Sequence, residues 1–314
     1  MELQHQFVTP ILFLIFNRPD TTRIVFDQIR KQKPRQLFVA ADGPRLTHND
    51  DALRCEQARA LVGTINWPCE VHTLFRDHNL GCGRAVSEAI TWFFSHVEQG
   101  IILEDDCVPD QTFFDFCTAM LERYRDDRRI MMITGTSYLF NKITSRESYF
   151  FSRYYPVWGW ATWRRAWERY DFKLDEWANR RPVSVIEQFF DERKIVDFWV
   201  RYFDRIVRRE LDTWDIQWTY ACSKHQALCV VPFNNLISNI GYFGLHATGV
   251  KSFDQGLELR PIDVMRIVHP NAVMSNKRFD RLVYKHIKVI PEHWLLRNIR
   301  RCCCAVKARL RHEV

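Results

Sequence analysis

Short apolar runs alternate with amphipathic stretches over the first 135 residues. The run at 10–16 is apolar throughout, which is typical of a parallel strand buried on both faces. Similar runs predict strands at 36–41, 69–75, 101–103 and 130–134. Helical spacing predicts helices at 21–31, 50–64 and 112–125, and another that follows Gly83 and reaches about residue 97, with Ile24 and Leu53 among the inward positions. This alternation predicts an α/β protein whose mostly parallel sheet is flanked by helices.

The pattern changes after Gly135. Residues 149–167 bring many aromatic side chains into a few turns, and 184–211 read as one long amphipathic helix. A strand is predicted at 228–233, followed by a loop at 234–249 that is rich in Asn, Gly and His. The second half is therefore expected to lack the regular alternation of strands and helices seen in the first.

Three consecutive carboxylates, Glu104, Asp105 and Asp106, end the apolar run at 101–103. Like charges packed at a strand end repel each other and raise their own pKa values. A divalent cation such as Mg²⁺ or Mn²⁺ would offset that repulsion and leave coordination positions open for phosphates. The alternative is a solvated acidic turn. The position at the carboxyl end of an α/β unit favours the metal, because ligands of open α/β sheets bind there.

Length and charge narrow the class of protein. The chain has 314 residues and 46% hydrophobic content, enough for one large domain with an extension. Residues 276–314 hold 11 Lys/Arg against 3 Asp/Glu, a net +8, so the other 275 residues total −1 of the overall +7. The basic charge belongs to the tail, and we expect no nucleic-acid partner for the main domain.

Targeting signals and cysteines indicate the compartment. The apolar run at 11–16 is too short to span a bilayer, and no cleavable leader pattern precedes it. The ten cysteines form no C-x-x-C pairs, and several, such as Cys117 and Cys229, have apolar neighbours. This pattern favours reduced thiols over disulfides or a zinc site. We expect a cytoplasmic protein.

Two aromatic stretches carry candidate chemistry. Trp158 and Trp160 belong to the aromatic segment, which either covers the sheet as a hydrophobic cluster or offers flat rings on which an acceptor sugar stacks. Asp215 stands between Trp214 and Trp218, a desolvating context that suits a general base with a raised pKa. The alternative for Asp215 is a helix N-cap, and the two roles are compatible.

Taken together, three stretches resemble a known family: Leu103-Glu-Asp-Asp106, Trp158-Gly-Trp160 and Trp214-Asp-Ile-Gln-Trp218. The chain resembles GT-A-fold, nucleotide-sugar-dependent glycosyltransferases, in particular the group that includes the N-acetylglucosaminyltransferase I type enzymes. The resemblance covers roughly residues 10–250. It departs from the family's Golgi members in lacking an N-terminal anchor, and 170–210 has no clear counterpart.

The resemblance implies a role for each matching residue. Asp106 would ligate the metal that bridges the donor diphosphate, with His246 near that metal, and Asp215 would be the general base of an inverting transfer. Contacts to the donor's base, ribose, phosphates and sugar would come from Asn17, Arg18, Asp42, Arg76, Asn79, Gly81, Arg84, Glu104 and Asp105. Surface charges remain the alternative for Arg76 and Arg84, and a satisfied loop histidine remains the alternative for His246.

The same resemblance sets the expected organisation. A GT-A-like domain would occupy residues 1–250, followed by an extension at 251–314. Within that domain, about 8–135 would bind the nucleotide sugar and about 136–250 the acceptor.

The expected activity is metal-dependent transfer of a hexose or N-acetylhexosamine, with Mn²⁺ or Mg²⁺, in surface glycan or polysaccharide synthesis. A UDP-sugar is the favoured donor, and the acceptor would be a glycan or a lipid-linked hydroxyl. One alternative is a sugar-phosphate nucleotidyltransferase, although Ile15-Phe-Asn-Arg-Pro-Asp20 lacks the glycines usual after its first strand. Another is a catalytically silent carbohydrate-binding or membrane-associated protein.

The C-terminal tail has its own pattern. Apolar residues recur at helical spacing among basic ones, namely Leu295, Ile299, Cys302, Val306 and Leu310. A basic amphipathic helix of this kind can lie on an anionic membrane surface, which would make the protein peripheral on the inner face of a membrane. The alternative is a helix packed on the catalytic domain with a solvated basic side.

Overall fold

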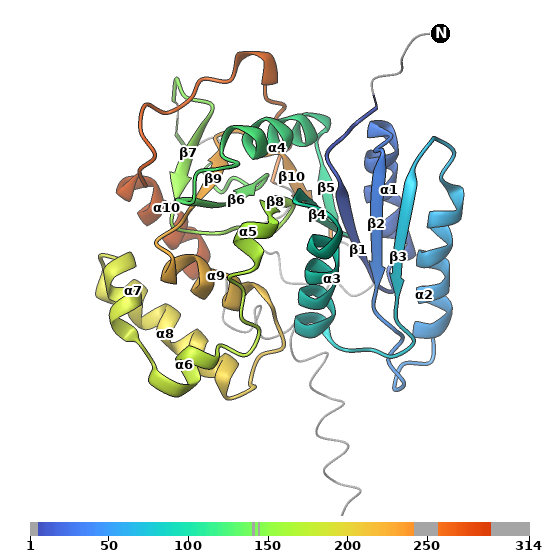
Figure 1. Cartoon of the computed structure of the whole chain (residues 1–314), viewed down its shortest axis with the longest axis horizontal. Helices are drawn as coiled ribbons and strands as arrows, with labels where there is room; N and C mark the ends of the chain where they lie inside the picture. Colours follow the sequence, from blue (N-terminus) through green and yellow to red (C-terminus); the bar gives the residue numbers. More distant parts are fainter. Residues whose placement is uncertain (1–5, 140–141, 144, 242–256, 290–314) are drawn as a thin grey trace, which may run out of the picture.

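The computed structural model describes residues 6–139, 142–143, 145–241 and 257–289 (Figure 1). Its strands are β1 (Ile11–Ile15), β2 (Gln36–Ala41), β3 (Glu70–Phe75), β4 (Gln99–Glu104), β5 (Cys107–Pro109), β6 (Ile130–Thr134), β7 (Tyr149–Ser152), β8 (Trp160–Trp163), β9 (Leu228–Pro232) and β10 (Ile237–Asn239). Its helices are α1 (Pro19–Gln32), α2 (Asp51–Ala60), α3 (Cys82–His96), α4 (Gln111–Arg123), α5 (Arg164–Trp167), α6 (Asp175–Arg180), α7 (Val183–Phe189), α8 (Arg193–Val207), α9 (Asp215–Lys224) and α10 (Lys277–Val289), with short 3₁₀ turns η1 (Leu61–Thr64) and η2 (Val264–Arg266).

Within these ranges, the central sheet has eight strands in the order β3-β2-β1-β4-β8-β6-β9-β7. The pairs β3–β2, β2–β1, β1–β4 and β6–β9 are parallel, and the other three are antiparallel. The predicted α/β architecture, a mostly parallel sheet flanked by helices, is confirmed. The chain runs outward from β1 to β3 and then returns to the other side of β1 as β4. That reversal creates a switch point between the carboxyl ends of β1 and β4, where ligands of such sheets bind.

Alternation along β1 explains how the sheet is covered on both faces. Leu12 and Leu14 belong to one buried cluster, together with Phe93 of α3. Ile11 and Phe13, one residue out of phase, belong to a second cluster that includes Phe26 of α1. Because successive strand side chains point to opposite faces, an all-apolar strand needs helices on both sides. The sheet therefore has two cores, and its carboxyl edge is left for the loops.

Some helix predictions need correction. Residues 184–211 do not form one helix: α7 ends at Phe189, α8 begins at Arg193, and Phe190 between them is buried and extended. The predicted helix at 50–64 is α2 followed by η1. Leu53 is 58% exposed and Ile24 46% exposed, so neither faces inward as predicted. The buried side of α1 instead uses Thr22, Val25, Phe26 and Ile29.

Residues 257–289 pack against the second half of the chain. The ring of Phe279 on α10 lies 5.1 Å from that of Phe150 on β7 and 5.6 Å from that of Phe233. The Asp280 carboxylate accepts a hydrogen bond from the Ser152 hydroxyl at 2.7 Å. These contacts attach α10 to the edge of the sheet formed by β7.

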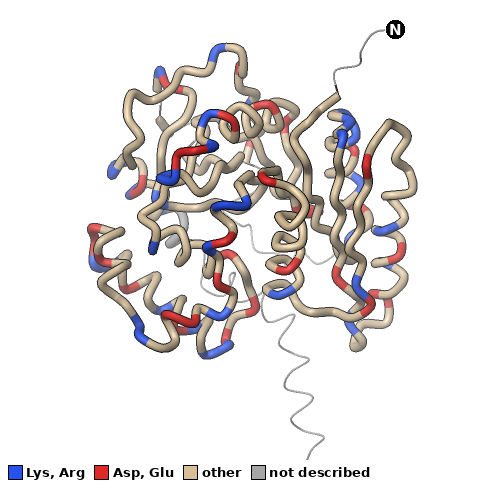
Figure 2. Tube along the Cα trace, viewed as in Figure 1, with Lys and Arg blue, Asp and Glu red and all other residues tan. Residues whose placement is uncertain are grey.

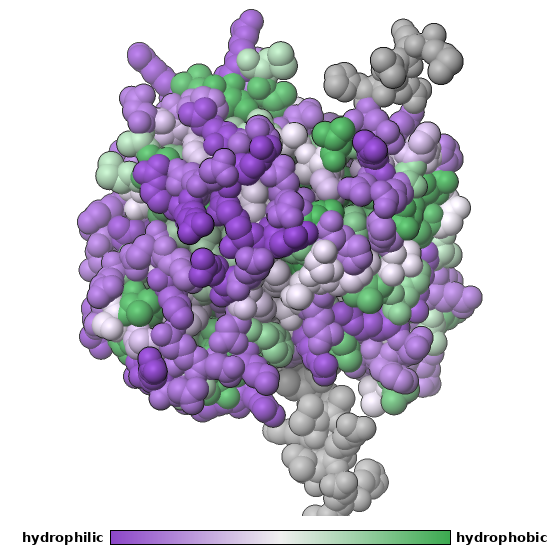
Figure 3. All heavy atoms as spheres, in the orientation of Figure 1, coloured by the Kyte–Doolittle hydropathy of each residue, from purple (hydrophilic) through white to green (hydrophobic). Residues whose placement is uncertain are grey.

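Surface properties agree with a folded domain of mixed charge. Figure 2 shows Lys and Arg interspersed with Asp and Glu along the trace, and Figure 3 shows apolar residues in scattered patches on the face that it displays. The seven cysteines that the structure describes are all free thiols. No helix in the described ranges is both long and apolar enough to cross a membrane.

Candidate active site at the sheet switch point

The loops after β1 and β4 meet at the switch point. The two strands are parallel neighbours with Leu14 opposite Glu104, so the residues that follow them emerge side by side. The Arg18 guanidinium bridges two carboxylates there: one nitrogen donates to Asp105 and the other to Asp106 Oδ2 at 2.8 Å. The backbone N–H of Phe16 also donates to Asp105, at 3.2 Å. Arg18 thus balances part of the carboxylate charge at the end of β4.

Burial and crowding keep protons on this cluster. Burial, together with the charges of Asp106 and Asp105, raises the pKa of Glu104 to about 8. Burial also raises the pKa of Asp105, although Arg18 opposes this effect. Burial would lower the pKa of Arg18, but the two neighbouring carboxylates hold it well above its ordinary value. Near pH 7 we therefore expect Glu104 to carry a proton while Arg18 stays charged.

A second segment passes over Asp106. Asn239 at the end of β10 points its amide at Asp106 Oδ1, 3.4 Å away, and the Ile240 N–H donates to the Asp106 carbonyl at 2.8 Å. A Cβ added to Gly241 would lie 2.3 Å from Asp106 Oδ2. Glycine at this position lets the backbone approach the carboxylate. Asp106 is therefore enclosed by Arg18 on one side and by residues 239–241 on the other.

The predicted metal site can be compared with these contacts. Asp106, the first predicted ligand, accepts a hydrogen bond from Arg18 through Oδ2, and the described ranges hold no group of three or more His, Cys, Asp or Glu side chains that could hold a metal ion. The second predicted ligand, His246, lies outside the described residues. Arg18 is hydrogen-bonded to Asp106 in this structure, and the metal site stays a prediction.

Asp215 of α9 lies close enough to Glu104 for its charge to raise the pKa of that carboxyl group. It is the first residue of this helix, and Trp214 takes the N-cap position. The Asp215 carboxylate accepts hydrogen bonds from the Thr213 hydroxyl and from the backbone N–H groups of Asp215 and Ile216. Burial raises its pKa and these bonds oppose the rise, while its own charge adds to the raised pKa of Glu104. The structure thus brings Asp215 close to the carboxylates after β4.

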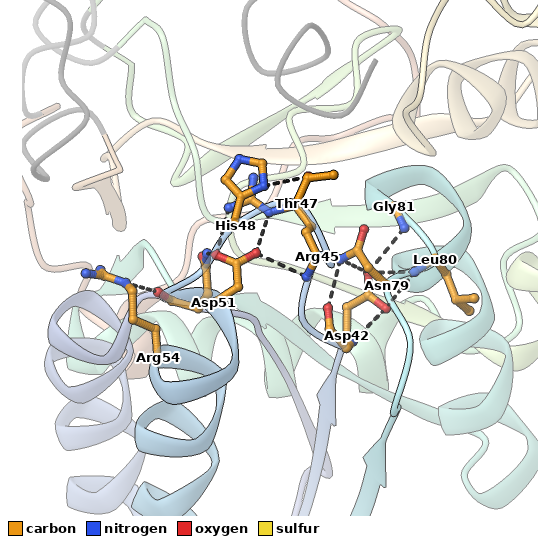
Figure 4. Close-up of polar contacts among 11 residues, drawn as sticks. Asp42, Arg45, Thr47, His48, Asp51, Arg54, Asn79, Leu80 and Gly81 are labelled. Atoms are coloured by element: carbon orange, nitrogen blue, oxygen red, sulfur yellow. Dashed lines mark hydrogen bonds and ion pairs between the residues drawn. The ribbon is translucent and has the colours of Figure 1, made fainter. Parts of the chain in front are cut away.

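Asp42, after β2, is held by the loop before α3 (Figure 4). Its carboxylate accepts hydrogen bonds from the Asn79 amide at 2.9 Å and from the backbone N–H groups of Leu80 at 3.0 Å and Gly81 at 3.2 Å. Burial raises the pKa of Asp42, and these backbone bonds oppose the rise. Asp42, Asn79 and Gly81 were each predicted to contact the donor, and here they contact one another.

Two of the three arginines predicted to contact the donor, Arg76 and Arg84, share one partner. Arg76 lies 3.5 Å from Glu88 and is largely buried, whereas Arg84 lies 2.6 Å from the same carboxylate and is 60% exposed. The geometry of Arg84 is that of an ordinary surface pair on α3. Arg76 has the more enclosed position, next to the Asp42 loop.

Asn17 belongs to a network that sequence analysis did not identify. Its amide donates to buried Asp51 at 2.6 Å, and Asp51 also binds Arg45. Burial would raise the pKa of Asp51, but these hydrogen bonds hold it below its usual range. Arg54 donates to the Asn17 carbonyl at 2.8 Å, so Asn17 is held through both its side chain and its backbone. The only sequence signal for this network is Asp51, a polar residue at the start of α2 that the structure buries.

The two tryptophans predicted to bind an acceptor differ in exposure. Trp160 is fully buried, and its ring stacks on Trp214 with centroids 5.5 Å apart and planes at 19°. The prediction of direct acceptor contact is corrected for Trp160, because its ring packs inside the core and supports the residue before Asp215. Trp158 is partly buried between the two cores.

Comparisons with known proteins add little. No protein-family model matches the sequence, and no curated protein matches it. Among solved structures, HddC from Yersinia pseudotuberculosis aligns at 10% identity and a TM-score of 0.27, over 40% of this chain and 57% of HddC. The inositol-1-phosphate CTP transferase from T. maritima aligns at 7% identity and a TM-score of 0.32, over 52% of this chain and 73% of that enzyme. This chain thus spans less than two thirds of HddC, and at these TM-scores neither likeness bears on its activity.

Proposed function

We propose that this chain is a glycosyltransferase that moves a sugar from a nucleotide diphosphate to a hydroxyl acceptor. The supporting observation is the convergence of Asp215 with Glu104, Asp105, Asp106 and Arg18 at the carboxyl ends of β1 and β4. Asp215, a carboxylate with a raised pKa, and Arg18, a guanidinium able to bind phosphate oxygens, both act on the pKa of Glu104. The family resemblance favours a UDP-sugar and a glycan or lipid-linked acceptor.

In the proposed reaction, the acceptor oxygen attacks the anomeric carbon while the bond from that carbon to the diphosphate breaks. The electron pair leaves with the diphosphate, and Asp215 takes the acceptor proton. Attack on the face opposite the leaving group inverts the anomeric centre. Arg18 would bind the diphosphate by releasing one of its two carboxylates. The requirement for Mn²⁺ or Mg²⁺ remains a separate proposal, which depends on Asp106 and His246.

The rival reaction is nucleotidyl transfer, in which a sugar phosphate attacks a nucleoside triphosphate. The two reactions release different products, a nucleoside diphosphate in the first and pyrophosphate in the second. We would incubate the full chain with a panel of nucleotide sugars, and separately with nucleoside triphosphates plus sugar 1-phosphates. Each incubation is run with Mn²⁺, with Mg²⁺ and with a chelator. Nucleoside diphosphate release from a nucleotide sugar supports the proposal, and pyrophosphate release in its place overturns it.

Two variants test the assigned residues. Asp215→Asn keeps the shape of the side chain but cannot take a proton, so turnover should fall roughly 10²–10⁴-fold while donor binding survives. Asp106→Ala should abolish metal-dependent binding of nucleoside diphosphate, measured by calorimetry. Asp197→Asn, an exposed aspartate on α8, is the matched control and should behave like the wild type. Turnover near the wild-type level in Asp215→Asn would refute the role of the base.

A further inference from the structure

Four consecutive backbone N–H groups in the loop before α3 are divided between two distant carboxylates. Leu80 and Gly81 donate to Asp42, as described above. Cys82 donates to Asp212 Oδ2 at 3.0 Å, and Gly83 donates to Asp212 Oδ1 at 2.9 Å. Asp212 comes from the segment just before α9, about 130 residues away along the chain. This loop therefore joins the end of β2 to the segment that carries Asp215.

The glycines of the loop are explained by this junction. A Cβ on Gly81 would lie 2.5 Å from Asp212 Oδ2, and Gly81 has a φ of +84°. A Cβ on Gly83 would lie 2.7 Å from the Thr213 carbonyl oxygen and 2.8 Å from Asp212 Oδ1. Only glycine allows the two segments to approach this closely. The glycine-containing loop, which was predicted to contact the donor, instead allows two distant parts of the chain to pack closely.

The same contact satisfies the start of α3. The first N–H groups of a helix lack partners within the helix, and a carboxylate is their usual substitute. Asp212 supplies both oxygens to this end of α3. A donor phosphate would have to displace this carboxylate in order to bind there. We therefore assign the diphosphate to Arg18 at the carboxyl ends of β1 and β4.

From Asp212 the contacts continue directly to Asp215. The next residue, Thr213, donates its hydroxyl to the Asp215 carboxylate. The Thr213 carbonyl accepts a hydrogen bond from the Gln217 amide at 2.8 Å, one turn into α9. Asp212 thus fixes the segment against α3, Gln217 fixes it against α9, and the Thr213 hydroxyl has a single orientation toward Asp215.

We propose that Asp212 and Thr213 are positioning residues for Asp215, through which the loop before α3 and the general base are held in one geometry. The inference rests on the proposed function in taking Asp215 as the base. Thr213 donates to the Asp215 carboxylate and opposes the rise in its pKa that burial causes. Asp212 keeps Thr213 in place.

The test separates this geometry from the activity. We would titrate the aspartate carboxyl carbons of the full chain by ¹³C NMR and assign the Asp215 signal as the one lost in Asp215→Asn. Thr213→Val removes the hydroxyl at nearly constant volume, so the pKa of Asp215 should rise, whereas Thr213→Ser should restore it. Thr219→Val is the matched control, because the Thr219 hydroxyl bonds the Asp215 backbone carbonyl and not its carboxylate. An unchanged Asp215 titration in Thr213→Val would overturn the proposal.

Kinetics provide the second readout. The acidic limb of the pH profile of kcat/KM should move upward in Thr213→Val and in Asp212→Asn, with kcat about 10- to 100-fold lower and donor affinity unchanged. A loss of donor affinity with an unmoved profile would make Asp212 merely structural and would overturn its assignment. If Asp215→Asn retains full transfer, the proposed base is wrong, while the NMR titration still decides whether Thr213 holds the carboxylate.

Discussion

Asp280 is a buried carboxylate whose ionisation should destabilise the fold at neutral pH. It lies on α10 and is 7% exposed. Its Oδ1 accepts hydrogen bonds from the Ser152 hydroxyl at 2.7 Å and from the Arg153 N–H at 3.2 Å, while Oδ2 is buried with no hydrogen-bond partner among the described residues. The Tyr154 hydroxyl is buried nearby and also lacks one. An ionised carboxylate with one unsatisfied oxygen is costly in such a place.

The size and sign of the effect follow from the pKa. Burial raises the pKa of Asp280 from 3.8 to about 6, with Asp191 adding to the rise and Ser152 and Arg153 opposing it. Because a tenfold change in proton affinity is worth about 1.4 kcal/mol, the difference corresponds to about 3 kcal/mol. Between these two pKa values the native state binds more protons than the unfolded state, so the free energy of unfolding falls as pH rises from about 4 to about 6 and levels off above.

The perturbation is Asp280→Asn, which removes the charge and keeps the shape of the side chain. We expect it to raise the free energy of unfolding by up to about 3 kcal/mol at pH 7.5 but by only about 1 kcal/mol at pH 4.5. The assay is urea denaturation followed by circular dichroism across this range. Asp20→Asn, at an exposed aspartate on α1, is the control and should show a much smaller difference at pH 7.5. A difference between Asp280→Asn and wild type that is the same at both pH values would refute the reasoning.

Two further predictions concern the loop junction and the tail. Gly83→Ala should lower the free energy of unfolding by about 1–3 kcal/mol, because its Cβ would meet the Thr213 carbonyl at 2.7 Å; Gly63→Ala, with nothing within 4 Å, is the control, and equal effects would contradict the packing argument. Residues 290–314 of the tail lie outside the described residues, and basic side chains near an anionic surface could each contribute about 1 kcal/mol. The full chain should therefore sediment with anionic liposomes more than a chain ending at residue 291, and equal partitioning of the two would rule the membrane proposal out.

The strands were the part of the fold best predicted from sequence. The ranges at 36–41 and 130–134 match β2 and β6 residue for residue, because these strands are apolar along nearly their whole length and few other structures can bury such a run. Helix faces were less accurate. On α2 the buried positions are Asp51, Cys55 and Ala58. Because Asp51 is polar, the hydrophobic spacing does not reveal this buried face; Asp51 is buried through its hydrogen bonds to Arg45 and Asn17. Periodicity alone does not count a paired charge as an inward residue.

The break between α7 and α8 was missed for a related reason. Residues 190–192 contain neither Pro nor Gly, and the apolar spacing continues through them. Phe190 leaves the helix because its buried ring packs against Trp199 and Tyr154, at 6.3 and 5.7 Å between centroids. These partners come from other elements, so the break depends on tertiary packing and has no local signal.

The candidate site illustrates which inferences a sequence can support. That Arg18 and the carboxylates after β4 would meet follows from strand order, since both end neighbouring parallel strands. The sequence does not show what these residues do once they meet. Carboxylates at the end of a strand can bind a guanidinium, or they can bind a metal ion that also holds phosphates, and the same residues are needed for both.

The glycines before α3 pose the same ambiguity. Backbone N–H groups exposed by glycine can hold a phosphate or a carboxylate, and in this chain Asp212 holds them. Because Asp212 leads directly through Thr213 to Asp215, a motif that looked like a donor contact is attached instead to the candidate base. Substitutions in this loop should therefore change the behaviour of Asp215 before they change the affinity for phosphate.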